Sequence, residues 1–431
     1  MNEGPTTIDR SAVEALHQEV VGDGTKGAPD EAVGHTLGEL ARSGRNVLHE
    51  GAMPALVLKE RALARNLAAM AEYCRRHGVL LAPHGKTTMA PQLMRRQVEA
   101  GAWAMTAATP SHLRVYRRFG IGRILYANPL VEPGTIRWVA RELERDPDFE
   151  LLCLVDSVAA VELLDQGLRE AGRVGVLVEL GYPGGRCGAR DRATALRVAA
   201  AVDAAPTLTL RGVECFESLL SRDGSPEGLA RIDAFLEAAR GVAAELRAGS
   251  SLTGAGEMLV SAGGSSFFDR VVRAFVADWD DATVRLVLRS GCYITHDSGF
   301  YDLVSPLAGR AEGGPALEDA IEIWSSVLSR PESELAILGM GRRDAPTDMG
   351  LPVPRKVLRR GAASPTAIGS ATVRSLNDQH AHVVVAADAE LAPGDLVACS
   401  VSHPCTAIDK WRLLLVVDDE YRIVDAISTF F

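Results

Sequence analysis

Aromatic residues, net positive charge and long apolar runs are all scarce in this sequence. Aromatic residues make up 5% of the 431 residues, and the formal net charge is -10. This negative balance argues against a protein that binds nucleic acid through its phosphate backbone. No uncharged apolar run reaches the roughly 18 residues that a membrane helix needs, and the N-terminus carries no apolar signal segment. We therefore expect a cytoplasmic protein with neither nucleic acid nor membrane as a partner.

Paired-cysteine motifs are missing as well. The cysteines show no CxxC spacing, and their odd number leaves at least one of them unpaired. Such a distribution is typical of reduced, intracellular thiols rather than of a disulfide framework. The seven cysteines are Cys74, Cys153, Cys187, Cys215, Cys292, Cys399 and Cys405.

The apolar residues that are present indicate an α/β fold. Eight short apolar segments alternate with helical stretches, and several of them, such as 151–155, are continuous runs. Continuous runs are typical of parallel strands that are buried on both faces. Eight such units fit a (β/α)8 barrel better than an open doubly wound sheet, which stays as the alternative. The strand candidates are 79–83, 103–108, 123–127, 150–155, 174–180, 210–216, 258–262 and 284–288.

The C-terminal part of the chain has a different pattern. Beyond Asp302, helical stretches become rare, and short strand candidates alternate with turn residues. This pattern predicts a smaller antiparallel β domain. We expect an N-terminal arm at 1–50, the barrel at 51–304 and the β domain at 305–431. The strand candidate at 54–58 precedes the barrel and could pair with the strands of the β domain.

One lysine is distinguished by its position. Lys86, in the segment Pro83-His84-Gly85-Lys86-Thr87, directly follows the first strand candidate of the barrel. A partly buried lysine amine can attack a carbonyl, as in the Schiff base that lysine forms with pyridoxal 5'-phosphate. A solvated surface lysine is the alternative interpretation.

Two glycine-containing loops follow the last two strand candidates. Gly263, Gly264 and Ser265 come after the seventh candidate, and Gly291 and Tyr293 come after the eighth. Glycines let backbone N–H groups approach an anion, and barrels often bind phosphate at these two loops. The pattern therefore predicts a phosphate site, although a plain tight turn would need the same glycines.

A third loop, after candidate 174–180, contains Tyr182 and Arg186 among several glycines. Small residues let the backbone bend around a ligand and hold the arginine over it. That arginine can donate to the phenolic oxygen of a pyridoxal ring. A surface arginine in an open loop is the competing interpretation.

His403 and Cys405 are a candidate metal-ligand pair. If segment 402–406 is extended, residues two apart project to the same side. Imidazole and thiolate together suit Zn2+ or another divalent metal, and two protein ligands leave positions open for a substrate.

Taken in order, these segments resemble the family of D-serine dehydratases and D-threonine aldolases. The resemblance rests on Pro83 to Thr87, on the glycine-serine loop at 263–265 and on His403-Pro404-Cys405. Two further motifs are Gly339 to Asp344, followed by Asp348, and Asn377 to His380. The family consists of pyridoxal-phosphate enzymes with the alanine-racemase-like fold, and the likeness runs from about Pro54 to the C-terminus.

The resemblance implies roles for individual residues. Lys86 is similar to the Schiff-base lysine, Arg186 to the arginine at the phenolic oxygen, and His403 and Cys405 to the metal ligands. The loop at 263–265 is similar to the phosphate site. The family's aldolases carry aspartate at the position of Cys405, so this cysteine favours elimination of water from D-serine to give pyruvate and ammonia. The partner of the pyridine nitrogen is unassigned, with Arg289 or a water as candidates.

Several alternatives remain open at this point. An aldolase that cleaves a D-3-hydroxy amino acid, a racemase and a carrier of the cofactor without catalytic activity are other functions of the same fold. D-threonine and 3-hydroxyaspartate are other substrates. The resemblance also implies a homodimer.

Overall fold

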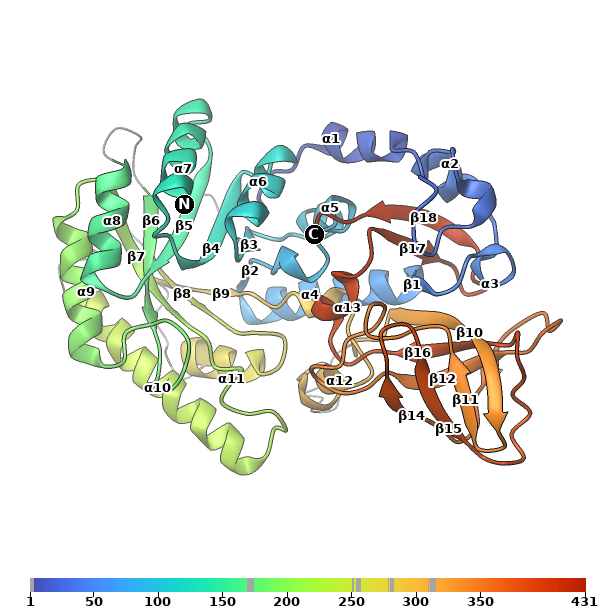
Figure 1. The fold of residues 1–431 in the computed structure, drawn as a ribbon. Coiled ribbons are helices and arrows are strands. Elements are labelled where there is room, and N and C mark those ends of the chain that lie inside the picture. The colour runs from blue at the N-terminus through green and yellow to red at the C-terminus, as the bar shows by residue number, and fades with distance from the viewer. Residues whose placement is uncertain are drawn as a thin grey trace.

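A computed structural model describes residues 4–168, 174–249, 252, 257–277, 279, 283–308, 310 and 315–431. Residues 1–3 of the expected arm lie outside the described residues. The chain forms a barrel of parallel strands surrounded by helices, and an antiparallel domain packs beside it (Figure 1).

The barrel contains the eight predicted strands. They pair in the order β2-β9-β8-β7-β6-β5-β4-β3, all parallel. A parallel bridge between His84 and Thr106 joins β2 to β3 and closes the ring. The expectation of a barrel is therefore confirmed. The strands are β2 (Leu80–Leu81), β3 (Met105–Ala107), β4 (Arg123–Pro129), β5 (Glu150–Val155), β6 (Val174–Leu180), β7 (Leu208–Cys215), β8 (Met258–Ala262) and β9 (Val284–Leu288).

The two faces of the barrel strands are buried in different ways. Leu152, Leu154 and Leu177 belong to a cluster that contains no helical residue and fills the inside of the ring. Their neighbours Cys153 and Val178 face outward and pack with the surrounding helices. Burial on both faces explains why these strands appear in the sequence as continuous apolar runs.

Helices cover the outside of the barrel. The longest helix, Pro226–Ala248, begins with a cap, because the Ser225 hydroxyl accepts a hydrogen bond from the N–H of Gly228. None of the helices in the described residues is long and apolar enough to cross a membrane. The helices are α4 (Glu60–His77), α5 (Pro91–Glu99), α6 (Pro110–Arg118), α7 (Pro133–Arg145), α8 (Val158–Leu168), α9 (Arg192–Ala204), α10 (Pro226–Ala248), α11 (Phe268–Val272) and α12 (Phe300–Val304).

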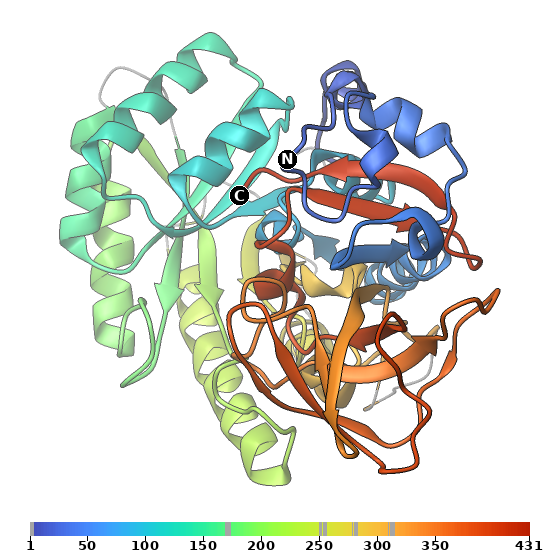
Figure 2. The same cartoon turned by 45° about the vertical axis from the view of Figure 1, so that its right-hand side comes forward.

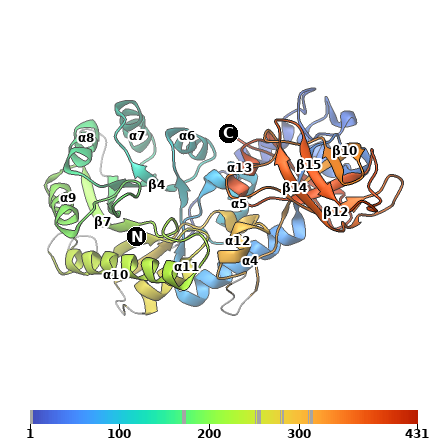
Figure 3. The same ribbon diagram turned by 60° about the horizontal axis from the view of Figure 1, so that its bottom comes forward.

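The second sheet has ten strands, and one of them precedes the barrel. β1 (Ala55–Lys59) pairs antiparallel with β10 and parallel with β17, so it lies inside the C-terminal sheet. The other strands are β10 (Ile321–Glu332), β11 (Leu335–Leu338), β12 (Val353–Leu358), β13 (Thr366–Ala367), β14 (Ala371–Leu376), β15 (Ala381–Val385), β16 (Leu396–Ser400), β17 (Leu413–Val417) and β18 (Ile423–Ser428). A short helix, α13 (Pro404–Ile408), connects β16 to β17 and lies between the two domains (Figure 3).

The N-terminal arm packs against this sheet. Its apolar residues, including Leu40 and Val47, form one cluster with Trp324 and Leu415. Figure 2 shows the arm lying along β17 and β18. The arm contains α1 (Arg10–Glu14), α2 (Leu37–Arg42) and α3 (Val47–Glu50).

Two of the sequence motifs have a structural role. Asp344 accepts hydrogen bonds from the Gly341 N–H and the Gln379 amide, both at 2.9 Å, which joins the motif at 339–344 to the motif at 377–380. The Asp344 carbonyl accepts from the Trp411 indole at 3.0 Å, and Lys26 of the arm pairs with the Asp344 carboxylate. These contacts fix the segment that leads out of α13.

Glycine is required at one position in the barrel wall. Gly212 has a φ of 143°, and a Cβ at this position would lie 1.8 Å from the Leu259 carbonyl oxygen on β8. We expect Gly212→Ala to lower the free energy of unfolding by about 2–4 kcal/mol, because the backbone is strained and β7 is pushed from β8. Urea unfolding measures the change. Gly241→Ala, in open space on α10, is the control and should be stabilising by up to about 1 kcal/mol. Equal effects of the two substitutions would contradict this account.

Candidate active site

A cavity of about 730 Å³ opens where the barrel strands end, and the antiparallel domain borders it. Such a position is where barrel enzymes carry their chemistry. Most of the predicted site residues line this cavity, namely Lys86, Tyr182, Arg186, Gly264, Ser265, Gly291, His403 and Cys405. Gly263 and Tyr293 do not line it.

Lys86 lies in a short 3-10 turn, Gly85–Thr87, directly beyond β2. A side chain at Gly85 would place its Cβ 2.3 Å from the Tyr116 hydroxyl, so the close packing of this loop requires glycine. His84 lies beside the lysine. Burial lowers the pKa of His84 well below its ordinary value, and the positive charges of Lys86 and Arg289 add to this effect. The imidazole is therefore neutral beside the lysine.

The glycine-serine loop is held by a carboxylate that the sequence analysis missed. The Gly263 and Gly264 N–H groups both donate to Glu217, each at 3.2 Å, and Glu217 is fully buried. Ser265 accepts from the Cys292 N–H at 3.1 Å. The two glycine N–H groups expected to bind phosphate are thus already engaged, although Gly264 lines the cavity. Ser265 and Gly291 remain as the other predicted phosphate residues that line it.

Tyr293 points away from the cavity. Its ring is buried in the core outside the barrel, and its hydroxyl accepts from the Gln97 amide at 3.2 Å. The 3-10 turn at Cys292–Ile294 reverses the direction of successive side chains, so Cys292 lines the cavity whereas Tyr293 lies on the outside.

Arg186 extends over the Phe216 ring, with its guanidinium carbon 4.4 Å from the ring centroid. The loop around it is held by Arg190, whose guanidinium donates to the carbonyls of Cys187 at 2.8 Å and Gly188 at 2.9 Å. Nothing in the sequence distinguished Arg190 from a surface residue, because its partners are carbonyl groups of the loop itself.

Buried charged residues form the floor of the cavity. Arg289 and Glu214 are each 3% exposed at the side chain and form an ion pair, and Arg289 also donates to the Ser261 hydroxyl at 2.9 Å. Burial, together with the negative charges of Glu214 and Asp156, raises the pKa of Glu179 to about 8. The sequence feature that could have revealed these residues is a polar residue at the end of an apolar run.

Some buried polar atoms in this floor have no hydrogen-bond partner in the described part of the chain. They are His84 Nδ1, Glu179 Oε2, Glu214 Oε2 and Arg289 Nε. Buried polar groups in folded proteins are nearly always satisfied. Together with Lys86, they make a cavity that fits a polar, charged ligand such as pyridoxal phosphate.

His403 and Cys405 enter the cavity from the antiparallel domain. The expectation of an extended segment was wrong beyond His403, because Pro404 is the first residue of α13 and Cys405 lies in that helix. The His403 Nδ1 lies 2.5 Å from the Asp348 carboxylate, which also accepts from the Thr406 hydroxyl at 2.8 Å. Burial raises the pKa of Asp348, but these two hydrogen bonds outweigh it and hold the pKa below its usual range.

Cys405 meets the barrel loops. Its sulfur lies 3.3 Å from the Thr87 hydroxyl and 3.3 Å from the sulfur of Cys292. The hydrogen bond from Cys292 lowers the pKa of Cys405, and the same contact raises the pKa of Cys292. Cys405 is therefore the better thiolate of the two. The sequence analysis did not predict that Cys292 lies here.

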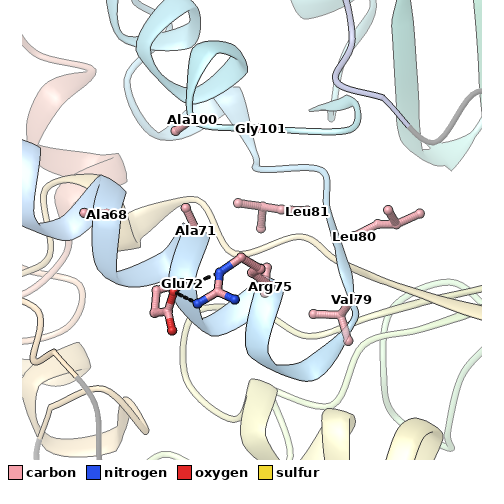
Figure 4. Close-up of a pocket in the computed structure, with 10 residues that line it drawn as sticks. Ala68, Ala71, Glu72, Arg75, Val79, Leu80, Leu81, Ala100 and Gly101 are labelled. Atoms are coloured by element: carbon pink, nitrogen blue, oxygen red, sulfur yellow. Dashed lines mark hydrogen bonds and ion pairs between the residues drawn. The ribbon is translucent and has the colours of Figure 1, made fainter.

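Two other features have less bearing on chemistry. Within the described residues, the one group of three metal-ligating atoms that all lie within 4.8 Å is Asp156, Glu179 and Cys187. Burial raises the pKa of both Glu179 and Cys187. A separate cavity of about 450 Å³ lies beside α4 (Figure 4), and its two charged lining residues, Glu72 and Arg75, pair with each other.

Comparisons with known proteins agree with this arrangement. Residues 320–417 match the model of the putative serine dehydratase domain. The chain is 26% identical over 305 residues to 3-hydroxy-D-aspartate aldolase of Paracoccus denitrificans (strain Pd 1222), covering 69% of this chain and 74% of that one. It is 32% identical over 136 residues to D-threo-3-hydroxyaspartate dehydratase of Delftia sp. (strain HT23), covering 31% and 35% of the two chains.

Solved structures show the same fold. D-threonine aldolase from Filomicrobium marinum superposes with a TM-score of 0.72 at 24% identity, over 89% of this chain and 96% of that one. A metal-free cysteine-to-alanine variant of D-threo-3-hydroxyaspartate dehydratase gives 0.69 at 21% identity, over 88% and 97%. In another variant of that dehydratase, a histidine two positions earlier is replaced by alanine. Alanine racemases share the fold at lower similarity, with a TM-score of 0.60 for the enzyme from Clostridium difficile 630 at 12% identity, over 88% and 99%. The chain is thus similar to D-threonine aldolases and to 3-hydroxyaspartate aldolases and dehydratases, and it has the alanine-racemase-like fold.

Proposed function

We propose that this chain is a pyridoxal-phosphate- and metal-dependent D-serine dehydratase, which releases pyruvate and ammonia. One observation carries the proposal. The Thr87 hydroxyl, next to Lys86, lies 3.3 Å from the sulfur of Cys405, so the candidate base and a candidate metal ligand border the same cavity. An elimination needs both a base at Cα and an acid at the β-oxygen.

Pyridoxal phosphate bound through Lys86 would supply the electron sink that stabilises negative charge at the substrate Cα. Arg186 is the candidate donor to its phenolic oxygen. Arg289, fixed by Glu214, is the candidate partner of its pyridine nitrogen. Ser265 and Gly291 are the candidates for its phosphate. The buried atoms without partners support a polar ligand in this cavity.

The chain's own residues divide the work of the elimination. The Lys86 amine removes the proton from Cα. His84 lies beside it and is neutral, so its imidazole does not take up the proton in place of the amine. His403 and Cys405 would hold the metal, which would supply Lewis-acid stabilisation of the departing hydroxide. Asp348 fixes the orientation of His403 by accepting its Nδ1–H, so the other nitrogen is presented to the metal. The aminoacrylate product then hydrolyses in water to pyruvate and ammonia.

The cysteine supports elimination over retro-aldol cleavage. The resemblance assigns aspartate to the aldolases at the position of Cys405. Solved variants of a dehydratase replace a histidine and a cysteine two positions later by alanine, and the cysteine variant is described in a metal-free form. The same spacing separates His403 and Cys405. The homodimer implied by the resemblance stays a prediction.

A second candidate is a dehydratase of 3-hydroxyaspartate. Arg222 lines the cavity, and its side chain is exposed rather than buried in an ion pair. A second carboxylate on the substrate would need a cation of this kind. The relatives named for 3-hydroxyaspartate support the same candidate.

We expect Lys86→Ala to remove the visible absorption of the bound cofactor and to lower turnover by at least about 10²–10⁴-fold, because both attachment and proton transfer are lost. Absorbance and pyruvate release measure the two effects. Lys410→Ala is the control, since this partly buried lysine does not line the cavity. A variant at Lys86 that keeps the band would contradict the assignment.

We expect pyruvate release from D-serine to stop when a chelator removes the metal and to return with added Zn2+. A panel of D-serine, D-threonine and 3-hydroxy-D-aspartate separates the candidates, with keto acid and glycine as the products measured. Glycine release from D-threonine would replace the dehydratase by an aldolase. Chelator-resistant pyruvate would remove the role of the metal.

We expect Asp348→Ala to weaken metal binding by about 10–100-fold, because His403 loses the acceptor that orients it. Competition with a chromogenic chelator measures the affinity. Asp348→Asn should recover part of it, since its amide oxygen can still accept from Nδ1. Asp378→Ala is the control, because this carboxylate is exposed and pairs with Arg343. Unchanged affinity in Asp348→Ala would contradict the role.

A further inference from the structure

Cys292 is a second buried thiol at the boundary between the two domains. It begins the turn that follows β9, and its residue is 4% exposed. Its sulfur lies 3.3 Å from the sulfur of Cys405 and 3.8 Å from the Thr87 hydroxyl. The barrel thus contributes one thiol and the antiparallel domain the other, at the same point of the cavity wall.

The distance between the two sulfurs suits one shared ion. Both cysteines are free, and 3.3 Å is far longer than the roughly 2.05 Å of a disulfide bond. Two thiolates on one zinc, each at about 2.3 Å, lie about 3.8 Å apart at the tetrahedral angle. Small side-chain movements are enough to bring an ion between them.

His403 is oriented to bind the same metal ion as the two thiols. Its Nδ1 is held by Asp348, so Nε2 is the nitrogen left for a metal. The ligand atoms of His403, Cys405 and Cys292 do not all lie within 4.8 Å of one another in this structure. Among the described residues, the group that meets this limit is a different one. The His403 side chain is 22% exposed, and closing the set requires it to turn toward the sulfurs.

We propose that Cys292 is a third protein ligand of the metal, which is then held by His403, Cys405 and Cys292. This inference rests on the proposed function, since it concerns the same metal. Three protein ligands with one open position are the usual arrangement of a catalytic zinc. Such an open position would be available to a substrate's β-oxygen.

Two consequences follow from a second thiolate. Soft sulfur ligands select zinc over magnesium, calcium or manganese, which prefer oxygen. In addition, the metal would join the turn after β9 to α13, and so tie the barrel to the antiparallel domain. Metal removal should therefore loosen the contact between the domains as well as abolish turnover.

The test counts sulfur atoms around zinc by X-ray absorption spectroscopy of the zinc-loaded holoenzyme. We expect two sulfur ligands in the wild type and one in Cys292→Ser, whose zinc affinity should fall by at least about tenfold. Cys187→Ser is the matched control, because this thiol also lines the cavity but lies with Asp156 and Glu179. It should keep both sulfurs.

The outcomes separate this inference from the proposed function. One sulfur in the wild type, with pyruvate release that a chelator still stops, overturns the role of Cys292 and leaves the dehydratase in place. A holoenzyme that holds no divalent metal overturns both. If Cys292→Ser does not fold, the sulfur count of the wild type decides alone.

Discussion

The pairing of β1 with the C-terminal sheet is the constraint on which the site depends. β1 precedes the barrel in the chain, yet it lies between β10 and β17 of the antiparallel domain. α4 starts at the next residue and leads to β2, whose end carries Lys86. Asn66 on α4 donates to the carbonyls of Ile294 and Glu318 and accepts from the Glu318 N–H at 2.7 Å. One helix thus fixes the lysine loop, the turn after β9 and the start of the second domain relative to each other.

The buried charged residues in the floor of the cavity lower the free energy of unfolding of the barrel. Removing one partner of a buried ion pair such as Arg289 and Glu214 is typically destabilising by about 3–5 kcal/mol, because the other charge is left buried. Glu179 avoids part of this cost, since a pKa of about 8 keeps it protonated at neutral pH. A core designed for stability alone would hold apolar residues at these strand ends. Buried polar groups at the strand ends lower stability unless their hydrogen bonds are satisfied, so their presence is consistent with a bound ligand that completes those hydrogen bonds.

The sequence predicted the barrel well because burial on both faces leaves a local pattern. Each strand appears as an apolar run, and the residues after each run line the cavity by geometry alone. The contacts between distant segments left no such pattern. The carboxylate of Glu217 on the loop at 263–265, the position of β1 within the second sheet and the approach of Cys292 to Cys405 all join residues at least 46 positions apart. Tyr293 shows that local structure can also escape prediction. A single 3-10 turn determines that Cys292, and not its neighbour Tyr293, faces the site.

The division of the site between two domains bears on how one fold supports several reactions. The barrel provides Lys86, and alanine racemases share the barrel fold at lower similarity. The segment that matches the serine dehydratase model, residues 320–417, is the part that contains His403 and Cys405. A fold does not determine a reaction, whereas the groups placed over the reacting atoms do. Under the proposed function, the barrel would supply activation at Cα, and the choice among proton exchange, retro-aldol cleavage and loss of water would rest with His403 and Cys405, at the start of α13. A change at Cys405 alone would then alter the bond that breaks, while the lysine, its loop and the floor of the cavity stay as they are.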